Sequence, residues 1–176
     1  MDPTADALLK ATAAVPEFTL NGRTLPAKVV ACYDGDTFYA VIPLGEGQLW
    51  KFNCRMGGYD TPEMKPPANK PGRDLEKARA MKAKQALMSQ VCAGVDMSKD
   101  ADKKVLDDLV AKNTKIIQLV CKEFDKYGRL LVEVPLADGS GTVNDWMIKN
   151  GYGYAYDGGK KDVSFATAAL AAVAVS

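Results

Sequence analysis

From Phe18 onward, apolar and polar residues alternate in a way that predicts β-strands. Three runs rich in Val, Ile, Phe and Tyr follow one another, separated by Asp34-Gly35 and by the Gly-Glu-Gly of residues 45–47. Alternation bounded by such turn residues is typical of short antiparallel strands. The pattern therefore predicts a three-stranded meander with the sequences RTLPAKVVACYDGD, TFYAVIPL and QLWKFNCRM.

The chain then changes character twice. Residues 57–74 are crowded with Gly and Pro and predict a loop. From Asp74 to about Cys92 alanine is frequent, no proline interrupts, and residues such as Leu75 and Met88 recur at helical spacing, which predicts a helix. Its outward positions are mostly basic, so they form either a solvated face or a contact surface for a phosphate backbone. These positions are Lys77, Arg79, Lys82 and Lys84.

Residues 96–113 form a polar, charged insert that carries a short amphipathic helix. Its acidic residues invite comparison with the calcium loop of an EF-hand that would start at Asp96. That loop needs glycine at its sixth position and a bidentate glutamate at its twelfth, where this chain has Ala101 and Asp107. We therefore reject an EF-hand in the insert.

Strand character returns after the insert, in TKIIQLVCKEF and RLLVEVPLADG, which are joined by the turn DKYG. VNDWMIKNG then fits a short helix that ends at Gly151. Five short strands, with a helix after the third and further helical segments toward the C-terminus, predict an α+β, mainly β fold: a five-stranded Greek-key barrel of the OB type. Strands and helices do not alternate regularly, which argues against a doubly wound sheet. We expect one domain at 17–162, containing the insert, between an N-terminal tail at 1–16 and an Ala-rich tail at 163–176.

Composition adds two exclusions. The formal net charge is +1, so any site for a polyanion must be built from local basic residues rather than from bulk charge. The chain has no histidine, which excludes Ser-His and Cys-His catalytic triads and histidine-ligated metal sites. Acid–base chemistry must therefore use carboxylates, lysine, tyrosine or water.

The four cysteines are widely spaced and form no Cys-x-x-Cys pair, which argues against zinc. We expect free, mostly buried thiols in a reducing compartment. The N-terminus lacks the basic and apolar regions of a secretory signal, and the longest apolar run is too short to span a bilayer. These features predict an intracellular protein with no membrane partner.

Several polar residues occur where a barrel would bring them together. Asp36 follows the first strand, Arg55 ends the third, and Asp60 to Glu63 come shortly after it. Arg129 lies in the turn between the fourth and fifth strands. In isolation Asp36 is explained as a cap on the Asp34-Gly35 turn, and each arginine as a surface or ion-paired residue. A five-stranded barrel, however, can bring all these places to one rim.

Taken in order, DGDT at 34–37, R-x-x-x-x-D-T-P-E at 55–63 and DKYGR at 125–129 resemble the staphylococcal nuclease, or thermonuclease, family. The resemblance runs from about Ala27 to Gly151. It implies a calcium-dependent phosphodiesterase that acts on DNA and/or RNA, with water attacking phosphorus and the 5′-oxygen leaving to give 3′-phosphate ends. We expect a monomer that prefers single-stranded or frayed substrate.

The resemblance also implies roles for individual residues. Asp36 and Asp60 match the calcium-binding carboxylates, and Thr61 supplies a backbone carbonyl. Calcium is a hard cation that takes oxygen ligands, and this set leaves coordination positions for water and a phosphate oxygen. Arg55 and Arg129 match the phosphate-binding arginines, whose planar donors fit two phosphate oxygens at once.

Glu63 matches the candidate general base, which either accepts a proton from the attacking water or mainly orients that water. Lys126 and Tyr127 match the positions that contact the terminal phosphate of the substrate. The tyrosines at 152, 154 and 156 either include a ring that stacks on a base or pack into the core or rim.

Three features depart from compact bacterial members: the longer insert, a net charge closer to zero, and the Ala-rich tail in place of a basic C-terminal helix. The alternative function is a degenerate domain that binds nucleic acid or protein without catalysis, and an unrelated OB-fold protein is a third reading. A degenerate domain should lack part of the catalytic set. All five members are present: Asp36, Arg55, Asp60, Glu63 and Arg129.

Overall fold

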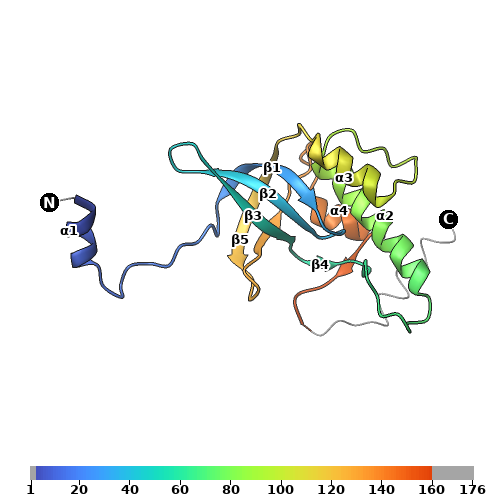
Figure 1. Ribbon diagram of the computed structural model, residues 1–176, viewed down its shortest axis with the longest axis horizontal. Coiled ribbons are helices and arrows are strands. Elements are labelled where there is room, and N and C mark those ends of the chain that lie inside the picture. The colour runs from blue at the N-terminus through green and yellow to red at the C-terminus, as the bar shows by residue number, and fades with distance from the viewer. Residues whose placement is uncertain (1–2, 160–176) are drawn as a thin grey trace.

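The computed structural model describes residues 3–159, and within them five strands close into a barrel (Figure 1). Neighbouring strands are antiparallel, except that β3 and β6 are parallel, and pairing of β1 with β5 closes the barrel. The predicted α+β barrel fold is confirmed. Around the barrel the strands are β1 (Thr24–Cys32), β2 (Thr37–Leu44), β3 (Gln48–Met56), β6 (Leu130–Glu133) and β5 (Ile117–Phe124).

The alternation of residues along β2 decides which side chains reach the cavity described below. Phe38, Ala40 and Ile42 point into the core and are fully buried. Because side chains in a strand alternate between faces, the intervening residues Thr37 and Tyr39 lie on the outer face of the barrel. The same face of β3 carries the residues opposite them, so one side of this strand pair is available for a site.

Three helices cover one side of the barrel (Figure 1). They are α2 (Arg73–Val91), α3 (Lys103–Ala111) and α4 (Val143–Lys149). The C-terminal half of α2 packs apolar residues such as Leu87 and Met88 into the core. Its first turns run past the barrel, so Leu75 is 55% exposed although it recurs at helical spacing with the buried Met88.

The insert at 96–113 lies against α2 through polar contacts. Gln85 donates hydrogen bonds to the carbonyls of Asp96 and Lys99, at 2.6 and 2.7 Å. Lys84 is fully buried, and its Nζ lies 3.0 Å from Oδ1 of Asp107 on α3. Lys84 was expected on an outward basic face, and that expectation is wrong because α3 covers it. The periodicity of residues within α2 could not show that α3 would pack over Lys84.

Three smaller elements complete the described chain. The N-terminal helix α1 (Pro3–Lys10) stands away from the barrel (Figure 1), within the segment 1–16 that was expected to be a tail. Strands β4 (Tyr59–Asp60) and β7 (Tyr154–Ala155) form a two-stranded antiparallel sheet that the sequence pattern did not predict. The expected Ala-rich tail and the end of the expected domain lie outside the described residues.

The cysteines behave as their spacing indicated. All four lie in the described part of the chain, and each is a free, buried thiol. Within residues 3–159, no helix has the length and apolar character needed to cross a bilayer.

Candidate active site

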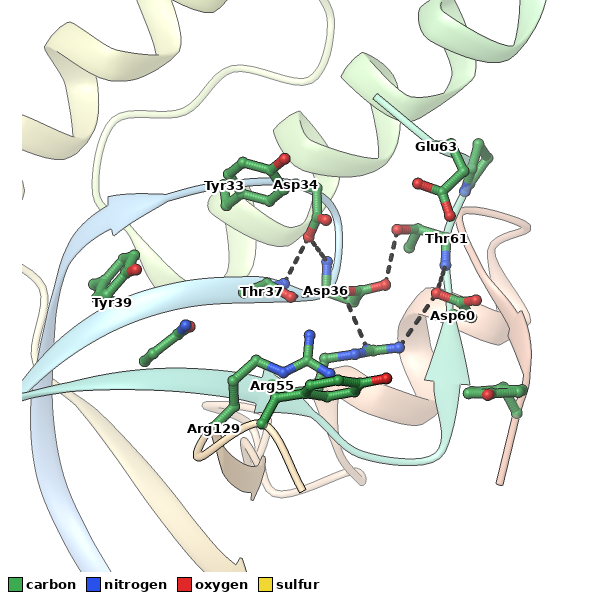
Figure 2. A pocket seen from close by; sticks show the side chains of 14 residues that line it. Tyr33, Asp34, Asp36, Thr37, Tyr39, Arg55, Asp60, Thr61, Glu63 and Arg129 are labelled. Carbon is green, nitrogen blue, oxygen red and sulfur yellow. Dashed lines mark hydrogen bonds and ion pairs between the residues drawn. The ribbon is translucent and has the colours of Figure 1, made fainter. Parts of the chain in front are cut away.

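A cavity of about 510 Å³ opens at the barrel rim (Figure 2). The β1–β2 turn, the end of β3, the segment around β4 and the β5–β6 turn all contribute to its wall. Every predicted site residue lines it except Lys126, which lines an adjoining cavity of about 410 Å³. The structure therefore brings together residues that the sequence scatters over three motifs.

The β1–β2 turn aims Asp36 into the cavity. Oδ1 of Asp34 accepts hydrogen bonds from the backbone N–H groups of Asp36 and Thr37, at 3.1 and 2.8 Å, so Asp34 forms an Asx turn. At Gly35 an added Cβ would lie 2.7 Å from Cβ of Ala83 on α2, which leaves space only for glycine. Asp34 and Gly35 thus make the turn, and Asp36 is left for another purpose.

The carboxylate of Asp36 is buried, with 4% of the residue exposed. Its Oδ1 accepts from the hydroxyl of Thr37 at 2.8 Å, and its Oδ2 accepts from the hydroxyl of Thr61 at 3.0 Å. Burial, followed by the nearby charge of Asp34, raises the pKa of Asp36 above its ordinary value, and Arg55 partly opposes the shift. A second cation beside Asp36 would favour its ionised form.

Arg55 lies between two carboxylates. Its Nη1 is 3.2 Å from Oδ1 of Asp36, its Nη2 is 3.2 Å from Oδ1 of Asp60, and Nη1 also donates to the carbonyl of Met56 at 3.0 Å. Figure 2 shows the guanidinium beneath both acids. One buried arginine thus faces two buried aspartates, with Asp34 nearby, so the inner wall of the cavity carries excess negative charge.

Asp60 is fixed by the small sheet. The hydroxyl of Tyr154 donates to its Oδ2 at 3.1 Å, and the backbone N–H of Thr61 donates to its Oδ1 at 3.1 Å. Tyr154 is only 9% exposed, so it supports Asp60 and is not a stacking platform for a base. Of the other two tyrosines, Tyr152 stacks on Trp146 and Tyr156 lines both cavities.

Tyr154 as a partner of Asp60 is a contact that the sequence did not reveal. The available signal was Gly153 beside it, where an added Cβ would lie 2.6 Å from Cδ2 of Tyr59 and 3.0 Å from the carbonyl oxygen of Asp60. A glycine inside a strand pattern indicates close backbone approach. Tyr59 is a second missed contact, because its hydroxyl donates to the carbonyl of Gly35 at 2.8 Å and ties β4 to the turn.

Arg129 and Glu63 occupy the more open parts of the site, on opposite sides of the aspartates in Figure 2. Nε of Arg129 donates to Oδ2 of Asp125 at 2.8 Å, and the arginine side chain is 28% exposed. Glu63 is exposed, and its backbone N–H donates to Oε1 of Glu76 on α2 at 3.3 Å. Both residues are therefore held by loops and remain accessible to a ligand.

Tyr127 adds an aromatic surface beside Arg129. The Tyr127 ring centroid is 5.4 Å from Cζ of Arg129 and 5.1 Å from Nζ of Lys126, so one exposed ring lies close to two cations. Cations held near an aromatic face offer both charge and a stacking surface to a ligand.

The donor set fits a hard cation such as calcium. The aspartates Asp36 and Asp60 and the carbonyl of Thr61 are all oxygen donors, and the local negative charge favours a divalent ion. In the described part of the chain, no three His, Cys, Asp or Glu residues lie close enough together to hold an ion. A cation here would therefore need carbonyl, water and substrate oxygens in addition to the two carboxylates.

Comparison with known proteins identifies the family of the chain. No curated protein matches the chain, whereas a family model described as staphylococcal nuclease homologue matches residues 53–173. The match begins in β3, so it includes Arg55 and Glu63, while Asp36 precedes it and reaches the site through the pairing of β2 with β3. Because the match covers well over half of the sequence, the chain belongs to the staphylococcal nuclease homologue family.

Proposed function

We propose that this protein is a calcium-dependent nuclease that hydrolyses phosphodiester bonds of DNA and/or RNA. Water attacks phosphorus, and the products carry 3′-phosphate ends. The observation that carries the proposal is the meeting of Asp36, Arg55 and Asp60 with Glu63 and Arg129 at one cavity. Membership of a nuclease-like family supports the same reaction class.

Asp36, Asp60 and the carbonyl of Thr61 would hold the calcium ion, on which this family generally depends. When bound, calcium supplies positive charge that stabilises a phosphate gaining negative charge. The protein contributes two carboxylates fixed in place by hydroxyl and backbone donors before any ligand arrives. That fixed arrangement lowers the reorganisation needed at the moment of reaction.

The arginines bind the phosphodiester. Each guanidinium presents donors that match two phosphate oxygens. The phosphate oxygens gain negative charge as phosphorus becomes five-coordinate, so both arginines favour the transition state over the ground state. Arg55 forms ion pairs with Asp36 and Asp60 and lines the cavity, so its guanidinium can contact a phosphate bound there. Arg129, which is held by its ion pair with Asp125, contacts the phosphate from the solvent-exposed side of the cavity.

Glu63 would accept a proton from the attacking water, because a carboxylate on the open side can lie against water that is aligned with the scissile bond. Lys126 and Tyr127 would bind the terminal phosphate of the substrate from the β5–β6 turn, next to the adjoining cavity. These roles place the scissile phosphate between the two arginines and leave Glu63 on the side from which water attacks.

The test is release of acid-soluble nucleotide from denatured DNA, with calcium and with a chelator. We expect release in calcium and none after chelation, and products that a polymerase extends only after phosphatase treatment. Equal release in both conditions contradicts the calcium site. Binding of DNA without release in either condition would identify the alternative, a binding module without catalysis. Asp60→Asn should also abolish release, which links the metal requirement to the cavity.

A further inference from the structure

The main cavity continues beyond the phosphate cluster, along the outer face of β2 and β3. Its wall there is formed by Tyr33, Tyr39 and Asn53. Tyr39 and Asn53 are directly opposite one another, one step beyond the pair formed by Thr37 and Arg55. Two strand residues correspond to about 7 Å along the sheet. Figure 2 shows Tyr33 and Tyr39 at the end of the cavity away from Glu63.

Neither Tyr39 nor Asn53 is explained by the packing of the barrel. Tyr39 is 37% exposed and Tyr33 is 59% exposed, although both are large aromatic residues. Within residues 3–159, Oδ1 of Asn53 is the one buried side-chain nitrogen or oxygen atom that has no hydrogen-bond partner. A buried amide oxygen without a donor is costly, so a donor from a ligand in this cavity would satisfy it.

The next step along the same face carries positive charge. Val41 on β2 lies directly opposite Lys28 on β1 and Lys51 on β3, so the two lysines flank it. Nζ of Lys51 lies 5.8 Å from the centroid of the Tyr39 ring. Neither lysine makes an ion pair with any described residue, and both are exposed. Their charges are therefore available to an anion.

From the rim outward, the outer face of β1–β3 thus presents first Arg55, then the Tyr39 ring with the Asn53 amide, and then Lys28 and Lys51. This order matches phosphate, base and phosphate along a nucleic-acid strand. Sequence-tolerant binding of single strands combines such aromatic platforms with basic side chains that follow the backbone. The outer surface of the second and third strands is also where OB-fold barrels bind oligonucleotides.

We propose that Tyr39, Asn53, Lys28 and Lys51 form a second nucleotide subsite, which rests on the nuclease function proposed above. It accepts the nucleotide that flanks the scissile phosphate on the side away from Lys126 and Tyr127. The base stacks on Tyr39 with its edge toward the amide of Asn53, and the following phosphate lies between the lysines. A paired base does not expose its face for stacking, so the subsite selects single-stranded substrate.

The experiment compares two cleavage-resistant probes in the presence of calcium. One is a short phosphorothioate-linked oligothymidylate, and the other is a nucleoside 3′,5′-bisphosphate, which is too short to reach from the arginines to Tyr39. We expect Tyr39→Thr to weaken binding of the oligonucleotide roughly 10-fold and to leave binding of the bisphosphate unchanged. Tyr39→Phe keeps the ring and should bind the oligonucleotide as the unaltered protein does.

The lysines have a separate readout. Lys28→Ala combined with Lys51→Ala should reduce the slope of log affinity against log salt by about 0.7 for the one phosphate lost, again for the oligonucleotide alone. Lys104→Ala combined with Lys112→Ala, an exposed pair at the two ends of α3, is the matched control for the loss of two charges. Trp50→Ala is the matched control for an exposed aromatic residue on β3 outside the cavity lining. Thermal unfolding of each variant confirms that it folds.

The outcomes separate the subsite from the nuclease function. Equal effects of Tyr39→Thr on the two probes, no effect on either, or an equal effect of Trp50→Ala overturns the subsite, while calcium-dependent cleavage by the unaltered protein still upholds the proposed function. If the unaltered protein binds neither probe and cleaves no DNA, the proposed function is wrong and the subsite is wrong with it.

Discussion

The inner and outer walls of the cavity use the same kinds of charged residue under opposite conditions. On the inner wall Asp36, Arg55 and Asp60 are each at most 8% exposed. Asp36 directly precedes β2, Arg55 lies near the end of β3, and Asp60 lies in the small β4–β7 sheet. On the outer wall Glu63 is exposed, and the Arg129 side chain is 28% exposed in a turn. The inner-wall residues therefore contribute to the stability of the fold. The outer-wall residues can be substituted with little change in stability, so their effect should fall on catalysis.

The two arginines make this difference concrete. Removal of Arg55 would leave two buried carboxylates without their cation, and a buried charge without a partner is strongly destabilising. Removal of Arg129 would leave Asp125, which still accepts backbone hydrogen bonds from residues 127 and 129 at 2.9 Å. One residue type in one cavity should thus give separable effects on activity and on stability.

The largest expected effect is that of Arg55→Ala. We expect nucleotide release to fall below detection and the free energy of unfolding to drop by about 3–5 kcal/mol, because the pairing of both aspartates is lost. Urea unfolding and the release assay measure the two effects. Arg55→Lys should restore much of the stability but little of the activity, since an ammonium lacks the planar donors. An unchanged free energy of unfolding would remove the distinction between the two walls.

Glu63→Gln should lower turnover by about 10²- to 10⁴-fold, because an amide cannot accept the proton of the attacking water. The free energy of unfolding should change by less than about 0.5 kcal/mol, as for other surface substitutions. Initial rates with saturating calcium and DNA measure the first effect. Glu46→Gln, in the exposed β2–β3 turn, is the matched control, and an equal loss there would argue that net charge, not proton transfer, sets the rate.

Arg129→Ala should lower turnover by about 10²- to 10³-fold, as expected for loss of one donor to transition-state charge. Its free energy of unfolding should fall by only about 0–1 kcal/mol, because its ion pair is partly solvated. Urea unfolding and the release assay on Arg129→Ala and Arg55→Ala together give the sharpest test of whether the inner and outer walls differ in their contribution to stability. Equal destabilisation by both substitutions would show that exposure does not decide the cost.

Calcium offers a readout that does not depend on catalysis. At a concentration 100 times the Kd, binding to the folded state alone should stabilise the protein by about 2.7 kcal/mol, which raises the midpoint of thermal unfolding. Asp36→Asn should abolish that shift, since a ligand carboxylate is gone. In chelator this variant should be no less stable than the unaltered protein, because a desolvated carboxylate has been removed. A full calcium shift in Asp36→Asn would place the ion elsewhere.

How much the sequence could predict depends on whether a feature is determined by residues close by in the chain or by distant ones. Asp36 was identifiable as a candidate site residue only through the resemblance of the three motifs taken together, because its own turn explains it equally well as a cap. Arg55 and Asp60 were identifiable through the same resemblance, because the short motif R-x-x-x-x-D-T-P-E holds them five residues apart. The barrel itself followed from alternation, which a strand carries along its whole length.

The features that the sequence did not reveal are set by distant partners. Lys84 is buried because α3, 23 residues later along the chain, brings Asp107 over it. The small sheet of β4 and β7 consists of two-residue strands, which are too short to show alternation. No periodicity within a segment records which other segment will cover it, so these contacts were visible only after folding.

The smallest expected effect tests whether such a distant contact affects the stability and the calcium affinity of the inner wall. Tyr154 and Asp60 are 94 residues apart, and Tyr154→Phe removes the hydroxyl that donates to Oδ2 while keeping the ring. We expect a loss of about 1 kcal/mol in the free energy of unfolding. We also expect calcium affinity, measured by the thermal shift, to fall about 10-fold, because a carboxylate ligand that loses its supporting donor is less well oriented. Tyr152→Phe is the control, since its ring stacks on Trp146. If both variants bind calcium like the unaltered protein, Arg55 and the hydroxyls of Thr37 and Thr61 are sufficient to orient the two aspartates. The small sheet then serves only to close the rim.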